Sequence, residues 1–492
     1  MNTTILRTRA GGVLWAERLF HGAFGAVLPV LLGVCAASWR YNSAAALGAA
    51  AVLGAGLWLA HRLLGPGLDA LPRRRFAVLF AACAAVYLAV LTAVGLALTE
   101  VLISDMGVVY GTLGEFLAAG HPVQNNDYYI ICSNNLGLAL LLAAFYAVTG
   151  IEPDQTTGVA AGICLNCGAI FVSVLLVCAA VRLLTGRQSA QLLALGCCAA
   201  FAPFYLWAPY FYSDTLCMPF LMGAVVLFLL YRRGAGRGRL WLAALCGAVS
   251  MAGFAVKGSL AVLPVAAVIA LLAERRDWRA ALAAAAAFAV LLAGYHLFEQ
   301  RYLDWSRQEE IGFPTELWLC YGSHELGDYN QADADLCQSL PTLTARRQAL
   351  REQLARNYRS RTAAQTVDFE LRKAAATWGD GEYGAREYLA APLRTGFLHR
   401  FTLEGQPGYM PLGYYCQAWQ YLLLALTALG SLWAAHRSDG ALMPRVALFG
   451  VMLFLSLWET KARYALHFAP VLLLCAVLAL DRLVRAGTAA RR

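Results

Sequence analysis

Residues 158–182 read GVAAGICLNCGAIFVSVLLVCAAVR and carry no acidic or basic side chain before the closing Arg182. A helix rises about 1.5 Å per residue, so this stretch is long enough to cross the roughly 30 Å hydrocarbon layer of a bilayer. Apolar blocks of about 18 to 25 residues recur on both sides of it along the chain. We therefore expect an all-α polytopic membrane protein.

The composition also indicates that the bilayer is the main solvent. Of the 492 residues, 60% are hydrophobic and 14% are charged, whereas about 25% of residues are charged in an ordinary soluble protein. The formal net charge of +9 comes from short arginine and lysine clusters between apolar blocks, which is typical of topology signals. We expect the lipid bilayer as a partner, and no nucleic acid.

The apolar blocks predict about 12 transmembrane helices. The first block follows Arg7 and Arg9 and is expected to remain as an anchor, because no small-residue cleavage pattern closes it. The predicted helices cover residues 18–37, 43–63, 76–98, 158–182, 189–206, 213–232, 239–256, 259–274, 279–298, 415–436, 442–458 and 464–482.

The most basic connecting segments are expected to face the cytoplasm, together with both termini. These segments contain Arg73, Arg74 and Arg75; Arg232, Arg233, Arg237 and Arg239; Arg275 and Arg276; and Arg482, Arg485, Arg491 and Arg492. Loop 99–128, segment 299–414 and the turn at Trp458 then fall on the opposite, outer face.

One further apolar block, 129–149, is ambiguous. If it crossed the membrane, the turn at 206–213 would lie inside and the Arg232 cluster outside, against the positive-inside rule. We therefore expect 129–149 to form a juxtamembrane or re-entrant helix on the outer surface. The alternative is an ordinary spanning helix where the charge rule is locally violated.

Three regions follow from this topology. Residues 1–298 are expected to form a transmembrane domain whose outer loop, 99–157, carries juxtamembrane helices. Residues 299–414 are expected to form a small extracytoplasmic domain, in which the stretch from Thr342 to Lys373 reads as helix. Residues 415–492 supply the last spanning helices and a cytoplasmic tail.

The 14 cysteines are scattered, and most lie in apolar blocks as small hydrophobic residues. Cys164 and Cys167 form a CxxC pattern within a predicted span, without the further ligands that a metal site needs. Cys320 and Cys337 lie in the outer domain, where they can pair if that compartment is oxidising.

Ionisable side chains beside a membrane are costly, so their positions are the best indication of a functional site. Asp105 directly follows the third predicted helix, where a carboxylate can act as a general base, bind a metal or simply end the helix in water. Asp214 lies on the outer turn before the sixth helix, where it or Ser213 can instead cap that helix.

Cations gather on the same predicted face. Lys257 interrupts two short apolar blocks next to Gly258, which suits phosphate binding, although snorkelling to the interface explains it equally well. Arg463 suits bidentate pairing with phosphate, and Glu459 can hold it in place. Glu459, Lys461 and Arg463 can also simply pair with one another.

A metal site is a further hypothesis. Glu115 and His121 in the first outer loop would form, with Asp214, a set of oxygen and nitrogen ligands for a divalent metal. Three residues so far apart in sequence are a weak signal, and metal dependence stays open.

The order of these parts resembles the GT-C superfamily of integral membrane glycosyltransferases, in particular the branch of protein O-mannosyltransferases and lipid A aminoarabinose transferases. Asp105 opens the first outer loop, and Tyr212-Ser213-Asp214 follows on a later outer turn. The segment Asn134-Asn135-Leu136-Gly137 resembles a Tyr-Pro-Asn-Asn or His-Pro-Pro region of bacterial relatives, although Cys132-Ser133 replaces the usual proline.

Later segments extend the resemblance over most of the chain. Glu459-Thr460-Lys461-Ala462-Arg463-Tyr464, with Pro470 beyond it, is similar to a Glu-x-x-x-Arg-Tyr closing helix of bacterial members. Trp318 to Asn330 and Thr377 to Gly381 look like outer-domain segments of uncharacterised bacterial members.

The resemblance implies transfer of a sugar from a polyprenyl-phosphate donor to an envelope glycan, lipid or protein on the non-cytoplasmic face. By that resemblance Asp105 is the general base, Lys257 and Arg463 bind the leaving phosphate, and Asp214 binds the acceptor or a metal. The supporting residues would be Tyr128, Asn134, Asn135 and Glu459.

Two other classes compete with a transferase. A transporter or flippase of lipid-linked glycan would hold its polar groups nearer the bilayer midplane, in paired broken helices of two related halves. A non-catalytic membrane scaffold would bind its partners through the outer domain and would tolerate replacement of Asp105.

Overall fold

The computed structural model describes residues 15–38, 42–122, 126–234, 239–275 and 277–489. Within these ranges the chain is built of helices, and a lone β-bridge joins Glu100 to Pro392. The predicted all-α class is therefore confirmed. The expected topology signals at Arg7, Arg9, Arg237, Arg276, Arg491 and Arg492 lie outside the described residues.

Seven helical segments of the described chain are long and apolar enough to cross a membrane. They are α1 (Trp15–Ser38), α2 (Ser43–Ala70), α3 (Arg73–Ala97), α8 (Thr157–Thr185), α11 with α12 (Ser213–Leu216 and Met218–Arg233), α15 (Trp278–Tyr302) and α23 (Tyr409–His436).

Other helices, most of them shorter, fill the remaining predicted spans. They are α9 (Gln188–Ala200), α10 (Ala202–Leu206), α13 (Leu240–Val256), η3 with α14 (Gly258–Ala261 and Val262–Arg275), α24 (Leu442–Leu457), α25 (Arg463–Leu466) and α26 (Ala469–Ala489). Each predicted range thus coincides with helix, while the count of about 12 crossings stays a prediction.

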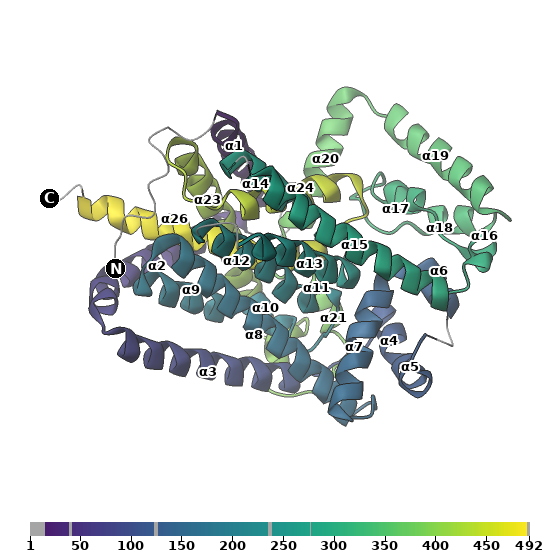
Figure 1. The fold of residues 1–492 in the computed structure, drawn as a ribbon, viewed down its shortest axis with the longest axis horizontal. Coiled ribbons are helices and arrows are strands. Elements are labelled where there is room, and N and C mark those ends of the chain that lie inside the picture. Colours follow the sequence, from purple (N-terminus) through teal and green to yellow (C-terminus); the bar gives the residue numbers. More distant parts are fainter. Residues whose placement is uncertain (1–14, 39–41, 123–125, 235–238, 276, 490–492) are drawn as a thin grey trace.

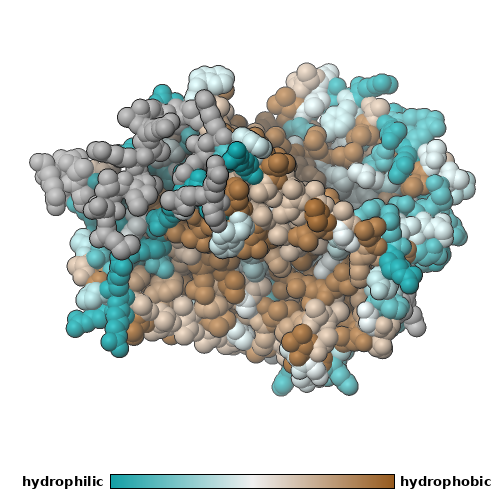
Figure 2. Space-filling model, in the orientation of Figure 1, coloured by the Kyte–Doolittle hydropathy of each residue, from teal (hydrophilic) through white to brown (hydrophobic). Residues whose placement is uncertain are grey.

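The surface agrees with a membrane setting. Apolar side chains cover the middle of the molecule, and hydrophilic side chains gather towards its two ends (Figure 2). Helices α2, α3 and α15 expose most of their apolar residues, which a water-facing protein could not tolerate as a continuous belt.

The basic connecting loops meet at one end of the bundle, which we call the basic end. Arg233 donates to the Leu183 carbonyl, and the guanidinium of Arg232 donates to the Gly440 carbonyl at 2.6 Å. The C-terminal helix α26 finishes at this end, whereas α17 (Thr315–Tyr321), α18 (Gln331–Gln338) and α19 (Leu343–Arg359) lie at the other, the domain end (Figure 1).

The ambiguous block is not one continuous helix. It divides into α6 (Asn126–Ile131), η1 (Ser133–Asn135) and α7 (Leu136–Thr149). Helix α7 is about 21 Å long at 1.5 Å per residue, which is short of the hydrocarbon thickness. It packs closely on α13. The backbone of Ala255 comes so near to Gly137 that a Cβ at this position would clash with it.

The predicted outer domain divides in two. Residues of α17, α18 and α19 share a small core of their own, in which Cys320 and Cys337 are buried free thiols. From Ala375 onwards, the buried residues Trp378, Tyr383 and Tyr388 join the main core of the bundle. The second part is therefore packed into the membrane-facing body and is not a separate module.

The helix predicted from Thr342 to Lys373 is also interrupted. Helix α19 ends at Arg359, and α20 (Ala363–Trp378) begins after Thr362. Thr362 and Gln365 form a reciprocal capping box that satisfies the first backbone donors of α20 and starts a new helix there.

Candidate functional site

Asp105 lies in the first turn of α4 (Ser104–Gly111), at the domain end of the bundle. Ser104 has a φ of 52°, a left-handed conformation that residues with a side chain rarely adopt. This turn presents the partly exposed Asp105 carboxylate to two tyrosines. Tyr128 donates to it at 3.0 Å and Tyr212 at 3.3 Å.

Asn135 joins both tyrosines into a closed network. Its buried amide donates to the Tyr128 hydroxyl at 2.7 Å, and its carbonyl oxygen lies 2.9 Å from the Tyr212 hydroxyl. Asn134 in turn donates to the Asn135 carbonyl oxygen at 3.3 Å. Burial and, next, the neighbouring Asp105 raise the pKa of both tyrosines, so their hydroxyls remain protonated donors.

A second carboxylate pairs with the predicted phosphate-binding lysine. Asp214, in the first turn of α11, is fully buried, and its Oδ1 lies 2.6 Å from the Lys257 ammonium. Lys257 ends α13 in an extended conformation. A role in capping a helix would not explain this ion pair. A buried carboxylate without an opposite charge would be costly, and Lys257 supplies that charge.

Arg463 lies between aromatic rings. Its guanidinium carbon is 5.5 Å from the ring centre of Tyr212, 5.3 Å from Tyr388 and 5.2 Å from Tyr464. All three distances are within the range of cation–π attraction. Burial opposes its charge, but Tyr464 and Asp214 favour it, and on balance the pKa of Arg463 lies well above its usual value.

Tyr212 connects the two halves of the site. Its hydroxyl faces Asp105 and Asn135, and its ring faces Arg463. The partly exposed Asp105 carboxylate and Arg463 therefore lie on either side of Tyr212, and Lys257 lies against Tyr464, which also faces Arg463. The arrangement can accept a proton on one side and neutralise an anion on the other.

The segment before Arg463 is built against the outer part of the chain. Lys373 donates to the Ser456 carbonyl at 2.7 Å, and the Thr460 amide donates to the Gly327 carbonyl at 2.6 Å. The Glu459 amide donates to the Trp318 carbonyl at 3.0 Å. We call residues 456–460, held in this way, the docking loop.

Glu459 and Lys461 do not pair with each other. The Glu459 carboxylate, whose pKa is raised by burial, accepts from the Tyr464 hydroxyl at 3.2 Å. Lys461 instead forms an ion pair of 3.5 Å with Asp328 in the outer part. Glu459 therefore supports the tyrosine that faces Arg463.

The predicted metal set is not assembled. In the part of the chain that the structure describes, no three His, Cys, Asp or Glu side chains are grouped as metal ligands. Gly120, with a φ of 73°, ends the helix that carries Glu115 (α5, Leu113–Ala119) and redirects the chain. His121 then stacks on Tyr302, 5.2 Å between ring centres, and does not approach Asp214.

A family model described as a conserved hypothetical integral membrane protein matches residues 71–484. The chain belongs to this family. The matched range contains Asp105, Asp214, Lys257 and Arg463. No curated protein and no solved structure matches the chain.

This member of the integral membrane family has a second charged cluster, at the basic end. Both oxygens of the buried Asp481 are within 3.1 Å of basic side chains: His61 and Arg187 contact one, and Arg485 contacts the other. Arg187 also pairs with Asp69 at 2.8 Å. Each charge there has an opposite charge in reach, which is typical of a structural contact between helices.

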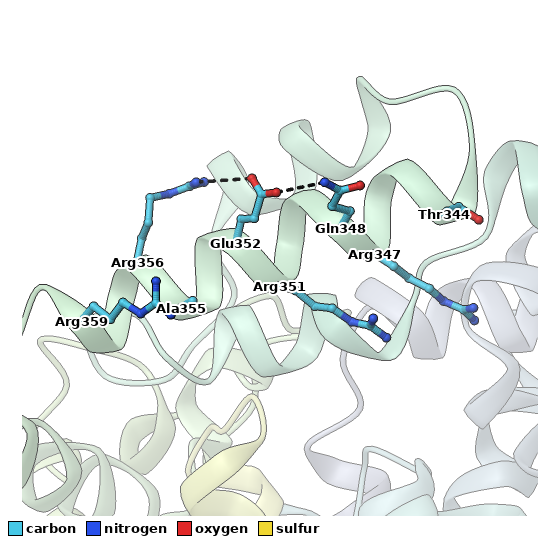
Figure 3. A pocket seen from close by; sticks show the side chains of 8 residues that line it. All are labelled: Thr344, Arg347, Gln348, Arg351, Glu352, Ala355, Arg356 and Arg359. Carbon is cyan, nitrogen blue, oxygen red and sulfur yellow. Dashed lines mark hydrogen bonds and ion pairs between the residues drawn. The ribbon is translucent and has the colours of Figure 1, made fainter.

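The third charged feature is the outer face of α19. Four arginines, Arg347, Arg351, Arg356 and Arg359, project from the side of the helix that borders a shallow, open hollow (Figure 3). Arg351 pairs with Glu316 at 2.7 Å, and Arg356 lies 3.9 Å from Glu352. One helix face cannot enclose a ligand, so this exposed face is a weaker candidate than the buried site.

Two kinds of site residue escape sequence reasoning. Tyr388 comes from the region assigned to a separate domain, and no local pattern distinguishes it from other tyrosines there. Ser259 and His467 follow Lys257 and Arg463 by a few residues, and the Ser259 hydroxyl lies 2.9 Å from His467 Nε2. Only their nearness in sequence to predicted cations could have indicated them.

Proposed function

We propose that this protein is a glycosyltransferase that moves a sugar from a polyprenyl-phosphate donor to an acceptor of the cell envelope. The observation that carries the proposal is that Asp105 and Arg463 both contact Tyr212, while Lys257 and Arg463 both contact the ring of Tyr464. An amphiphilic phosphate can leave its chain in lipid while its headgroup reaches cations at one end of the bundle.

The proposed chemistry needs one base and one anion site. Asp105 takes the proton of the acceptor hydroxyl while the acceptor oxygen bonds to the anomeric carbon of the sugar. The bond from that carbon to the phosphate oxygen breaks, and its electron pair leaves with polyprenyl phosphate. Lys257 and Arg463 neutralise the charge that develops there, in a site where little water screens them.

The hydrogen-bond network suggests how Asp105 is held for this role. Tyr128 and Tyr212 donate to opposite oxygens of the carboxylate and fix its plane. Asn135 fixes both tyrosines. Asp214, which contacts Lys257, fits a role in orienting that cation better than a role in metal binding.

The sidedness is part of the same proposal. We propose about 12 crossings, cytoplasmic termini at the basic end, and the site on the non-cytoplasmic face. The positive-inside rule supports this orientation. A transporter or flippase is less favoured, because it would hold its polar groups nearer the middle of the bilayer.

The test compares sugar transfer by membranes that contain the wild type, Asp105→Asn or Asp368→Asn, with a panel of radiolabelled polyprenyl-phosphate sugars and envelope acceptors. Asp368 is an exposed carboxylate of the outer part and serves as the matched control. We expect Asp105→Asn to lower the rate by about 10²- to 10⁴-fold and Asp368→Asn to leave it unchanged.

Two results would count against the proposal. Equal transfer by the wild type and Asp105→Asn would remove the role of Asp105. An absence of transfer by the wild type, with every donor and acceptor, would favour a transporter or a scaffold instead.

A further inference from the structure

A hydrogen bond joins the two segments that carry the cations. The Ser259 hydroxyl, two residues after Lys257, lies 2.9 Å from Nε2 of His467, four residues after Arg463. The Lys257 ammonium is also 5.2 Å from the ring centre of Tyr464. The turn after α13 and the turn between α25 and α26 therefore pack against each other at the proposed phosphate site.

His467 is fully buried, and its Nδ1 has no hydrogen-bond partner among the described residues. No carboxylate of the described chain forms an ion pair with it, and its ring packs on Phe468, 4.9 Å between ring centres. Burial without an opposite charge favours a neutral imidazole, which carries one proton.

The position of that proton decides what Ser259 can do. With the proton on Nε2, His467 donates to the Ser259 oxygen, and the hydroxyl proton of Ser259 is free for another acceptor. With the proton on Nδ1, a buried N–H would be left unsatisfied, and the Ser259 proton would be used on His467. The first arrangement satisfies the only donor of the ring.

There is room for a ligand beside this hydroxyl. A Cβ added to Gly258, which lies between Lys257 and Ser259, would meet no atom within 4 Å. Ser259 is itself only partly buried. The turn therefore presents an ammonium and a hydroxyl on either side of an open backbone position.

We propose that Ser259 is a third ligand of the donor phosphate, and that His467 is the positioning residue that directs its hydroxyl. The Ser259 O–H donates to a phosphate oxygen that Lys257 and Arg463 neutralise, while His467 donates to the Ser259 oxygen. This inference rests on the proposed function, because it deepens the same phosphate site.

The chain of two hydrogen bonds has a physical advantage. A hydroxyl that accepts a hydrogen bond becomes a stronger donor, because each bond polarises the next. Lysine is a point charge on a flexible stem, so it attracts a phosphate without fixing its orientation. A directed hydroxyl supplies that orientation.

The test measures binding of labelled undecaprenyl phosphate to the purified full-length protein in nanodiscs. Ser259→Ala and His467→Leu should each weaken binding about tenfold, as expected for a hydrogen bond to a charged group. The double variant should bind no more weakly than Ser259→Ala alone, because His467 acts through Ser259. His467→Gln, whose amide can replace the Nε2 donor, should bind nearly as the wild type does.

Three controls make the readout specific for the phosphate. Ser431→Ala removes a hydroxyl that bonds only its own helix, to Thr427, and should have no effect. Undecaprenol, which lacks the phosphate, should bind the wild type and Ser259→Ala equally, whereas a general packing defect would weaken both lipids. Competition with inorganic phosphate separates a free phosphate site from a lipid headgroup site.

Failure of this inference can be told apart from failure of the proposed function. Undiminished binding by Ser259→Ala would overturn the role of Ser259, and additive losses in the double variant would overturn the positioning role of His467. In both cases Lys257→Ala and Arg463→Ala should still weaken binding. If those two variants also bind as the wild type does, the phosphate site itself is refuted.

Discussion

The two ends of the bundle hold buried charges in different ways. At the basic end, the carboxylate of Asp481 is contacted by His61, Arg187 and Arg485. At the domain end, Arg463 is surrounded mainly by tyrosine rings, and its Nε has no hydrogen-bond partner in the described part of the chain. In the first cluster every charge contacts an opposite charge, whereas within the described ranges Arg463 forms no ion pair with a carboxylate.

The difference teaches how to tell a structural charge cluster from a candidate site. A buried ion is costly unless it is paired, so a cluster that serves stability is expected to pair every charge. Aromatic faces stabilise a cation without occupying its hydrogen-bond donors. The Nε donor of Arg463, which has no partner in the described part of the chain, is thus one that a phosphate could use.

The largest expected effect separates the two arginines by their role. Arg463→Met should lower sugar transfer by about 10³- to 10⁵-fold, as removal of a transition-state arginine does in phosphoryl transfer. Arg187→Met should lower stability but leave transfer per folded molecule unchanged. Transfer rates, normalised to the folded fraction from size-exclusion chromatography, check both. Equal losses of transfer in Arg463→Met and Arg187→Met would show that the two clusters do not differ in role.

The next effect concerns a buried ion pair at the basic end. Arg445, fully buried, binds Asp439 through two hydrogen bonds of 2.7 and 2.6 Å. Arg445→Met should reduce the free energy of unfolding by up to about 3–5 kcal/mol, because the buried Asp439 is left with the more distant Arg482, at 3.8 Å, as its partner. The control Arg372→Met, which breaks an exposed pair with Asp368, should change it by less than about 1 kcal/mol. Denaturant titration in micelles measures both.

The Asp439–Arg445 pair should also make the stability of the protein depend on pH in acid. The pKa of Asp439 is lowered to about 2 from 3.8: burial opposes ionisation, but Arg445 outweighs it. A lowered carboxyl pKa gives stability that is present above about pH 4 and is lost as the pH falls towards 2. Acid unfolding of Arg445→Met that followed the same curve as the wild type would contradict this contribution.

The smallest expected effect comes from another buried carboxylate. Glu100 lies 3.5 Å from His399 at the β-bridge near the domain end, and burial raises its pKa from 4.5 to about 7. A raised carboxyl pKa gives stability below about pH 4.5 that is lost as the pH rises through 7.

Glu100→Gln should therefore stabilise the protein by about 3 kcal/mol at pH 8 and by less than about 1 kcal/mol at pH 5. Unfolding free energies of both proteins at the two pH values check this. A stabilisation of equal size at both would show that ionisation of Glu100 is not the cause.

Much of the architecture could be predicted because the bilayer imposes a simple pattern on the sequence. Uninterrupted apolar blocks such as 158–182 correspond to helices, and the arginine clusters between them meet at one end. The charged candidate residues could be found for a related reason, because a charge next to an apolar block is conspicuous. They are Asp105, Asp214, Lys257 and Arg463. The structure brings Lys257 to Asp214, and Asp105 and Arg463 to Tyr212, while the roles of these four residues stay a prediction.

Contacts between distant segments could not be predicted in the same way. Tyr388 and His467 approach the cations through packing that leaves no local pattern. The proposed metal set is not assembled among the described residues, and His121 instead stacks on Tyr302. The break between α19 and α20 was missed, although Thr362 with Gln365 three residues later is a capping-box pattern that could have indicated it.

The docking loop has a consequence for protein engineering. Residues 456–460 take their shape from Lys373, Gly327 and Trp318, and Arg463 follows only three residues later. The contacts made by the outer part therefore help to set the position of the cation site. A chimaera that exchanges residues 315–378 between relatives must also exchange 456–460. Otherwise the loop before Arg463 would lose the backbone partners that hold it.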